Sequence, residues 1–171
     1  MRTLLYFAYG SNMHAPRLRE RTPSCEPYAV ARLPGYRLCF NKRSNDPSDR
    51  SGKCNIVVSD SEDAEVLGVV YRFEVAEKVA LDRAEGDGYA QVSLEVQAAV
   101  GGLGVYCYHA RDTHVDDSLT PYAWYKELVV QGARGHRLPD HYIDFLDSHP
   151  AIDDHDVRRA SVHFRLATKP T

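Results

Sequence analysis

Glu85 is the ionisable residue whose place in the sequence is best suited to catalysis. It ends residues 74–85, whose apolar side chains recur at helical spacing, and Gly86-Asp87-Gly88 follows it. We therefore predict a short helix that Gly86 terminates. The negative end of a helix dipole disfavours a carboxylate, and partial burial would add to this effect, so Glu85 is a candidate general acid and base. The alternative is a solvated glutamate at a helix end.

The turn Gly10-Ser11-Asn12, called the 10–12 turn below, is the second candidate for chemistry. It follows the apolar run of residues 4–9, which predicts a buried strand. Its glycine would allow dihedral angles that a side chain forbids, and its serine or asparagine would cap a helix over residues 13–21. Backbone N–H groups at such a turn can bind an anion or a developing oxyanion. A turn with no chemical function fits the same pattern.

Other reactive residue types are less well placed. Ser11 could act as a nucleophile, but it lacks the Gly-x-Ser-x-Gly elbow and an obvious histidine or aspartate partner. Residues 153–156 contain metal-ligand types, yet they lie in a polar tail without helical spacing, which favours a solvated acidic turn. Residues 82–88 do not have the spacing of a calcium-binding loop. We therefore predict no metal site.

The elements that must position these residues begin as a series of strands. Residues 41–53 are rich in polar and charged types and are predicted to form a long exposed loop. Gly68 indicates a bulge or a close approach within its strand. Gly101-Gly102 is expected to turn the chain between two strands of a hairpin. The predicted strands after the first are residues 28–33, 36–41, 54–59, 66–73, 89–100 and 105–110.

The last third of the chain is predicted to be mostly helical. Thr120-Pro121 has the form of an N-cap followed by proline at the first helical position, and this helix would stop near Gly132. A second helix is expected from Pro139 to Pro150. The polar tail, residues 151–171, contains a candidate last strand at residues 161–166. Strands with interposed helices indicate one mixed α/β or α+β domain over residues 1–171, built on a curved sheet or barrel.

Composition and charge limit the classes of partner. The net charge is −3 with 43% hydrophobic residues, so no basic excess favours nucleic acid. No apolar run approaches the ~18 residues of a membrane span, and no signal-peptide pattern is present. The cysteines form no Cys-x-x-Cys pair, which favours a reduced, cytoplasmic protein over a disulfide framework or a zinc site. These cysteines are Cys25, Cys39, Cys54 and Cys107.

Three segments together resemble the γ-glutamylcyclotransferase family. The stretch from Tyr6 to Met13 is similar to that family's Tyr-Gly-Ser-Asn signature, which follows a first strand. Residues 81–86, Leu-Asp-Arg-Ala-Glu-Gly, with Tyr89 shortly after, resemble the segment that carries the family's catalytic glutamate. Residues 124–139, with Trp-Tyr-Lys-Glu, Gly-Ala and Leu-Pro, resemble its C-terminal helical region. The resemblance covers nearly the whole chain in order.

The resemblance implies an α+β fold around a small β-barrel-like sheet with flanking helices, and no metal or organic cofactor. It also implies a reaction in which a γ-glutamyl amide, the small-molecule partner, cyclises to 5-oxoproline and releases an amine. Glu85 corresponds to the general acid and base. The implied substrate-binding residues are Tyr6, Phe7, Ala8, Tyr9, Gly10, Ser11, Asn12, Tyr108 and Tyr125.

Several alternatives stay open from the sequence. The amine could be an amino acid, a polyamine, a lysine side chain or an acylated natural product, and the protein could be a monomer or a homodimer. Residues 41–53 and the tail have no firm counterpart in the resemblance, and either could set specificity. A binding module for a γ-glutamyl or small carboxylate ligand, without turnover, is the second hypothesis. A hydrolase with Ser11 as nucleophile is the third.

Overall fold

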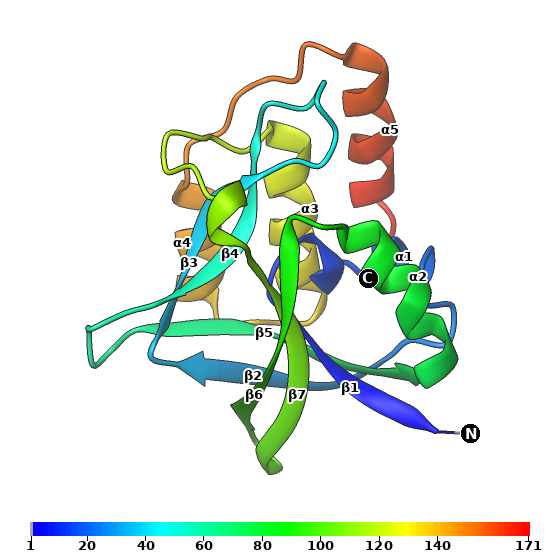
Figure 1. The fold of residues 1–171 in the computed structure, drawn as a ribbon, viewed down its shortest axis with the longest axis vertical. Helices are drawn as coiled ribbons and strands as arrows, with labels where there is room; N and C mark the ends of the chain where they lie inside the picture. The colour runs from blue at the N-terminus through cyan, green and yellow to red at the C-terminus, as the bar shows by residue number, and fades with distance from the viewer. Residues whose placement is uncertain (1) are drawn as a thin grey trace.

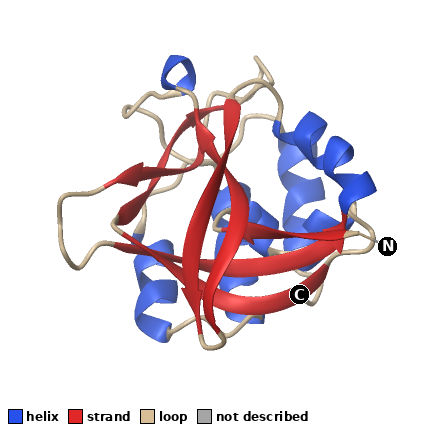
Figure 2. Cartoon of the chain, turned by 60° about the horizontal axis from the view of Figure 1, so that its bottom comes forward, coloured by secondary structure: helices blue, strands red, loops and turns tan. Residues whose placement is uncertain are grey.

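The computed structural model describes residues 2–171, and its centre is a closed five-stranded barrel in the order β1-β5-β2-β6-β7 (Figures 1 and 2). This architecture, with its flanking helices, confirms the predicted barrel-like α+β fold. Strands β3 and β4 form a separate two-stranded sheet. The strands are β1 (Thr3–Ala8), β2 (Glu26–Pro34), β3 (Tyr36–Arg43), β4 (Gly52–Val58), β5 (Glu65–Glu74), β6 (Tyr89–Ala98) and β7 (Gly101–Ala110).

Strand β1 closes the barrel because it pairs with a neighbour on each side. It runs antiparallel to β5 along its length and meets β7 in parallel where Tyr6 faces Tyr106. A Cβ atom on Gly68 of β5 would lie only 2.4 Å from the carbonyl oxygen of Ala8, so a side chain there would separate the two strands. The predicted close approach at Gly68 is confirmed.

The helices gather on one side of the barrel, and in Figure 1 α3, α4 and α5 lie above it together with the β3–β4 hairpin. Helix α3 packs so closely on η1 that a Cβ on Gly132 would lie only 2.6 Å from the backbone nitrogen of His14. Among residues 2–171, none of the helices combines the length and apolar composition that a membrane crossing needs. The helices are α1 (Ala15–Arg19), α2 (Lys78–Glu85), α3 (Ala123–Gly135), α4 (Asp140–Ser148) and α5 (Val157–Ala167), with 3₁₀ turns η1 (Ser11–Met13), η2 (Val75–Glu77) and η3 (Asp112–His114).

The first helix differs from the prediction over residues 13–21. Its N-cap is His14, whose carbonyl accepts hydrogen bonds from the N–H groups of Arg17 and Leu18. No side chain caps either η1 or α1, so the capping role predicted for Ser11 or Asn12 is wrong. The side chain of Asn12 is used inside the molecule instead.

The third helix begins later and ends later than predicted. Tyr122 is its N-cap, because the carbonyls of Thr120 and Pro121 already accept hydrogen bonds from the N–H groups of Gly52 and Ile152. The helix also continues past Gly132, so this glycine does not end it. Its lack of a side chain allows the close contact between α3 and η1.

The candidate strand at residues 161–166 is wrong, because this segment lies within α5. Val162 and Phe164 of this helix are both exposed. The helix starts at Asp156, whose side chain accepts a hydrogen bond from the N–H of Arg159. That N-cap was the stronger signal in the sequence.

The loop predicted at residues 41–53 is shorter than expected. Strand β3 runs to Arg43 and β4 starts at Gly52, so only residues 44–51 connect them. Lys42 lies opposite Lys53 in this hairpin, after a shift in register. Lys42 is buried, which its charge did not suggest.

Candidate active site

A cavity, called the central cavity below, lies at the rim of the barrel and brings together most of the residues that the sequence singled out. It draws side chains from β1, η1, β4, α2, β6, β7 and α3. Phe7 and Ala8 are the predicted site residues that do not line it, since both are packed in the core. Its lining residues are Tyr6, Tyr9, Gly10, Ser11, Asn12, Cys54, Glu85, Tyr89, Tyr108 and Tyr125.

Glu85 is the last residue of α2, as the sequence predicted, and its side chain is half-buried. Gly86 follows with a φ of +67°, a conformation that ends the helix and that L side chains rarely adopt. The backbone carbonyl of Glu85 accepts a hydrogen bond of 2.7 Å from the side chain of Asn45. The helix end that carries the carboxylate is therefore held from the β3–β4 connection.

Asn12 joins the carboxylate to the barrel. Its Nδ2 donates to Oε1 of Glu85 at 2.7 Å and to the hydroxyl oxygen of Tyr6 at 3.0 Å. Its Oδ1 accepts from Nη1 of Arg21 at 3.1 Å. All polar atoms of this amide side chain thus have partners, and Asn12 is buried.

The tyrosines of the central cavity are neutral hydroxyl groups. Burial raises the pKa of Tyr6, Tyr9, Tyr89 and Tyr125 well above the ordinary value, and the nearby charge of Glu85 adds to the rise at Tyr6. They can therefore donate or accept hydrogen bonds, but they do not serve as anionic bases at neutral pH.

Cys54 and Tyr89 are the two lining residues that sequence reasoning did not assign to the site. The backbone N–H of Cys54 donates to the hydroxyl of Tyr125 at 3.0 Å, and the hydroxyl of Tyr89 donates to the Cys54 carbonyl at 2.6 Å. Burial raises the pKa of the Cys54 thiol to about 12, so it is no nucleophile at neutral pH. Nothing in the sequence around Cys54, a single cysteine at the start of a strand, indicates that it lines the site. Tyr89 could have been identified, because it directly follows the glycine-rich turn after Glu85.

Tyr108 is held by a second carboxylate on the same helix as Glu85. Its hydroxyl donates to Oδ1 of Asp82, and its pKa is raised first by burial and then by this hydrogen bond. Both oxygens of Asp82 also lie 2.7 Å from Nζ of Lys78. Asp82 precedes Glu85 by nearly one helical turn, so the two carboxylates share a helix face.

The 10–12 turn approaches β4 closely. Gly10 has a φ of −116° and a ψ of −144°, so it does not adopt the left-handed conformation. A Cβ on Gly10 would lie 2.9 Å from Cβ of Cys54, so the close approach to β4 leaves little space for a side chain. Within residues 2–171, the N–H groups of Ser11 and Asn12 donate to no backbone or side-chain acceptor. No histidine lines the central cavity beside Ser11.

A second hollow, called the vestibule below, adjoins the central cavity. The two share Ser11, Asn12, Glu85, Tyr89 and Tyr125. The remaining wall of the vestibule is rich in positive charge and comes from α1, the end of α2 and the β3–β4 hairpin. It consists of Arg17, Arg21, Lys42, Ser44, Asn45, Asp46, Lys53 and Ala84.

The acidic stretch at residues 153–156 lies apart from both hollows. Asp154 is buried and accepts hydrogen bonds from Nε1 of Trp124 at 2.8 Å and from Nε of Arg159 at 2.6 Å. The part of the chain that the structure describes contains no group of three His, Cys, Asp or Glu side chains arranged to hold a metal ion.

Comparison with known proteins places the chain among named relatives. The profile of the AIG2-like family matches residues 65–146. The bovine γ-glutamylcyclotransferase is 32% identical over 148 residues, which cover 85% of this chain and 78% of that protein. The human γ-glutamylcyclotransferase is 30% identical over 156 residues, covering 90% and 81%. The solved structure of a γ-glutamyl cyclotransferase superposes with a TM-score of 0.84 at 26% identity, covering 96% of this chain and 99% of that one.

Proposed function

The chain belongs to the γ-glutamylcyclotransferase family of enzymes, and we propose that it converts a γ-glutamyl amide into 5-oxoproline and a free amine with Glu85 as general acid and base. The observation that carries this proposal is the carboxylate of Glu85, fixed by Asn12 on the wall of the central cavity beside the 10–12 turn. Cyclotransferase activity is common to the named relatives, whereas the role of each residue is our proposal.

The reaction begins with proton removal. The α-amine of the substrate is a cation and cannot attack, so the Glu85 carboxylate first accepts one of its protons. The amine nitrogen then forms a bond to the γ-carbonyl carbon of the same molecule and closes a five-membered ring. Because nucleophile and electrophile belong to one molecule, the cavity has only to select the folded conformer.

The second half of the reaction releases the amine. The bond between the γ-carbon and the amide nitrogen breaks, and protonated Glu85 returns its proton to the departing amine. The ring nitrogen still carries one proton more than the lactam keeps, and this second proton passes to the released amine, which leaves as an ammonium ion. One carboxylate thus serves in turn as base and acid, a contribution of about 10²–10⁴-fold in rate. No covalent enzyme intermediate is required, which is compatible with a central cavity that offers Ser11 no histidine.

The carbonyl oxygen gains negative charge while the ring forms. The N–H groups of Ser11 and Asn12 have no acceptor of their own and are our candidates to stabilise this oxyanion. The surrounding tyrosines, neutral at the pH of the reaction, would line the site without competing for the proton that Glu85 carries. We assign Tyr6, Tyr9, Tyr108 and Tyr125 to substrate binding.

The test is direct detection of 5-oxoproline. The purified protein is incubated with a panel of γ-glutamyl amides, and the products are identified by mass spectrometry. We expect 5-oxoproline from the parent protein and a loss of at least about 10²-fold in rate for Glu85→Gln. Glu62→Gln, which changes an exposed glutamate outside both hollows, is the matched control.

Three outcomes would change the proposal. Full turnover by Glu85→Gln would remove the acid and base assignment. Ligand binding without 5-oxoproline from any amide would favour the binding module. Free glutamate with a covalent adduct on Ser11 would favour a hydrolase.

A further inference from the structure

We propose that Lys42 and Asn45 of the β3–β4 hairpin are positioning residues for catalysis, because they hold the turn after α2 and with it the end of the helix that carries Glu85. The inference rests on the proposed function, in which Glu85 is the general acid and base. It deepens that function by identifying what keeps the carboxylate in place from outside the central cavity. Both residues lie outside the lining of that cavity, so they act through Glu85.

Asn45 caps the helix at the residue that carries the carboxylate. The backbone carbonyl of Glu85 lies at the end of α2, where carbonyl groups have no partner within the helix. Nδ2 of Asn45 donates a hydrogen bond of 2.7 Å to this oxygen. A Cβ on Gly86 would lie only 2.4 Å from the same nitrogen, so the absence of a side chain at Gly86 is what admits the amide.

Lys42 determines which way the Asn45 amide faces. Its Nζ donates to Oδ1 of Asn45 at 2.8 Å, and an ammonium group can only donate. The amide oxygen must therefore face Lys42, which leaves Nδ2 to face the carbonyl of Glu85. Lys42 itself is held in place, because its side chain is buried and its Nζ lies 4.5 Å from the centre of the Tyr89 ring.

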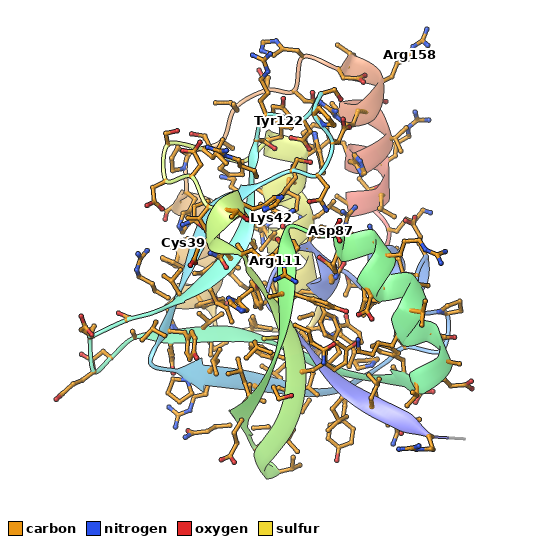
Figure 3. All side chains as sticks on the ribbon, viewed as in Figure 1. Cys39, Lys42, Asp87, Arg111, Tyr122 and Arg158 are labelled. Carbon is orange, nitrogen blue, oxygen red and sulfur yellow. The ribbon has the colours of Figure 1, made fainter. Side chains whose placement is uncertain are left out.

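The turn after α2 fits closely around this pair. A Cβ on Gly88 would lie 2.6 Å from Cε of Lys42 and 2.7 Å from Oδ1 of Asn45, so a side chain there would displace both. From the other side, the backbone N–H and the Nε of Arg111 donate to the carbonyls of Gly88 and Asp87, both at 3.0 Å. Figure 3 labels Lys42, Asp87 and Arg111 where the hairpin meets this turn.

Glu85 is thus held by two asparagine amides, one on its side chain and one on its backbone. Asn12 donates to Oε1 of the carboxylate and Asn45 donates to the main-chain carbonyl, both at 2.7 Å. In each pair a cation faces the amide oxygen. This cation is Arg21 for the first asparagine and Lys42 for the second. A shift of the helix end would lengthen both contacts with Glu85, so the two amides support the same position.

Position matters here because a general acid and base must lie within hydrogen-bond reach of the nitrogen that it serves, about 2.6–3.2 Å. Glu85 serves two nitrogens in turn, the α-amine and the departing amine. A misplacement of about 1 Å is enough to cost about 10²-fold in rate. Lys42 and Asn45 also lie on the wall of the vestibule, where a direct contact with the substrate would act on KM instead.

The experiment measures kcat and KM for 5-oxoproline formation from the γ-glutamyl amide that the parent protein converts fastest. Asn45→Asp keeps the shape of the side chain but turns an acceptor toward the carbonyl of Glu85. Lys42→Met keeps the buried stem and removes the ammonium group. We expect each change to lower kcat by at least about tenfold, and to leave KM within about twofold of the parent.

Gly88→Ala tests the same contact from the turn. The φ of Gly88 is not positive, so alanine is compatible with its backbone, and the added Cβ meets only the ends of the Lys42 and Asn45 side chains. We expect it to lower kcat as Asn45→Asp does. The double variant should be no slower than the slower single variant, because both changes break one contact, whereas independent roles would give losses that multiply.

Ser48→Ala is the control within the same connection. Ser48 is exposed, lies outside both hollows and contacts Asp46 and Arg159, so its change leaves the contact with Glu85 intact and should retain parental kcat. Thermal unfolding monitored by circular dichroism establishes that each variant is folded. Asn45 is exposed, so Asn45→Asp keeps the test decisive if the buried change Lys42→Met prevents folding.

The outcomes separate this inference from the proposed function. Parental kcat in Asn45→Asp and Gly88→Ala overturns the inference, while loss of 5-oxoproline in Glu85→Gln leaves the proposed function standing. A raised KM with parental kcat also overturns it, since the pair would then contact the substrate. An equal loss in Ser48→Ala would mean that any loosening of the connection is sufficient. Absence of 5-oxoproline from the parent with every amide contradicts the proposed function itself, and the inference falls with it.

Discussion

Nδ2 of Asn12 lies 2.7 Å from Oε1 of Glu85, although the two residues are far apart in the sequence and belong to different elements. The orientation of the amide is determined by its other contact, because Oδ1 faces a guanidinium nitrogen of Arg21, which can only donate. The nitrogen must therefore face the carboxylate. Asn12 thus couples the 10–12 turn to the end of α2.

Replacing Asn12 by aspartate tests this coupling. Asn12→Asp removes the donor and places a second negative charge beside Glu85, so the carboxylate is repelled from its position. A displacement of this kind costs on the order of 10²-fold in kcat. Gln91→Glu makes the same amide-to-acid change at an exposed position of β6 and should retain parental kcat. Parental activity in Asn12→Asp would mean that the hydrogen bond does not position Glu85.

Asp82 is predicted to act through Tyr108. Asp82→Asn weakens the acceptor for the tyrosine hydroxyl, and Tyr108→Phe removes the donor. Because the aromatic ring at position 108 is then held less firmly at the central cavity, either change should lower kcat by about tenfold. If the two residues act as a unit, the double variant should be no worse than the poorer single variant. Steady-state kinetics on the four proteins give the coupling. Asp87→Asn, an exposed aspartate in the following turn, is the control, and additive losses would show independent roles.

The site could be predicted where local chemistry determines position. The apolar run into the 10–12 turn and the glycine after Glu85 indicated a strand end and a helix end, and both lie at the central cavity. What the sequence did not show is that Asn12 would turn inward. The side chain of Asn12 could have capped the helix that follows it, but it donates a hydrogen bond to the distant carboxylate of Glu85 instead. Only the tertiary structure decides between these two partners.

Burial of charge was the main reason for the errors in the β3–β4 region. Lysine is almost never fully buried, so Lys42 and Lys53 were expected in an exposed loop. In the structure their ammonium groups lie over the rings of Tyr89 and Tyr125, and Lys53 also pairs with Asp49. No sequence rule identifies the aromatic partners in advance, because Tyr89 and Tyr125 belong to β6 and α3, far along the chain.

Asp154 is expected to stabilise the fold at neutral pH. Its side chain is fully buried and accepts hydrogen bonds from Arg159 and Trp124. Asp154→Asn therefore removes the main carboxylate partner of the largely buried Arg159, which keeps only the longer contact with Asp46 at 3.3 Å. A loss of about 3 kcal/mol in the free energy of unfolding is typical of such a change. Denaturant unfolding at pH 7 measures it, and Asp153→Asn, at the exposed neighbouring position, is the matched control.

The pH dependence of that loss follows from the pKa of Asp154, which the hydrogen bonds from Arg159 hold well below the usual range. A carboxyl group with a depressed pKa in the folded state contributes its stability above its unfolded pKa, near about 3.9, and loses it as the pH falls toward the folded value. The difference between the parent and Asp154→Asn should therefore be constant from about pH 5 to about pH 7 and shrink below about pH 4. A difference that stays the same at low pH would mean that Asp154 stabilises the fold through packing, and that its charge contributes nothing.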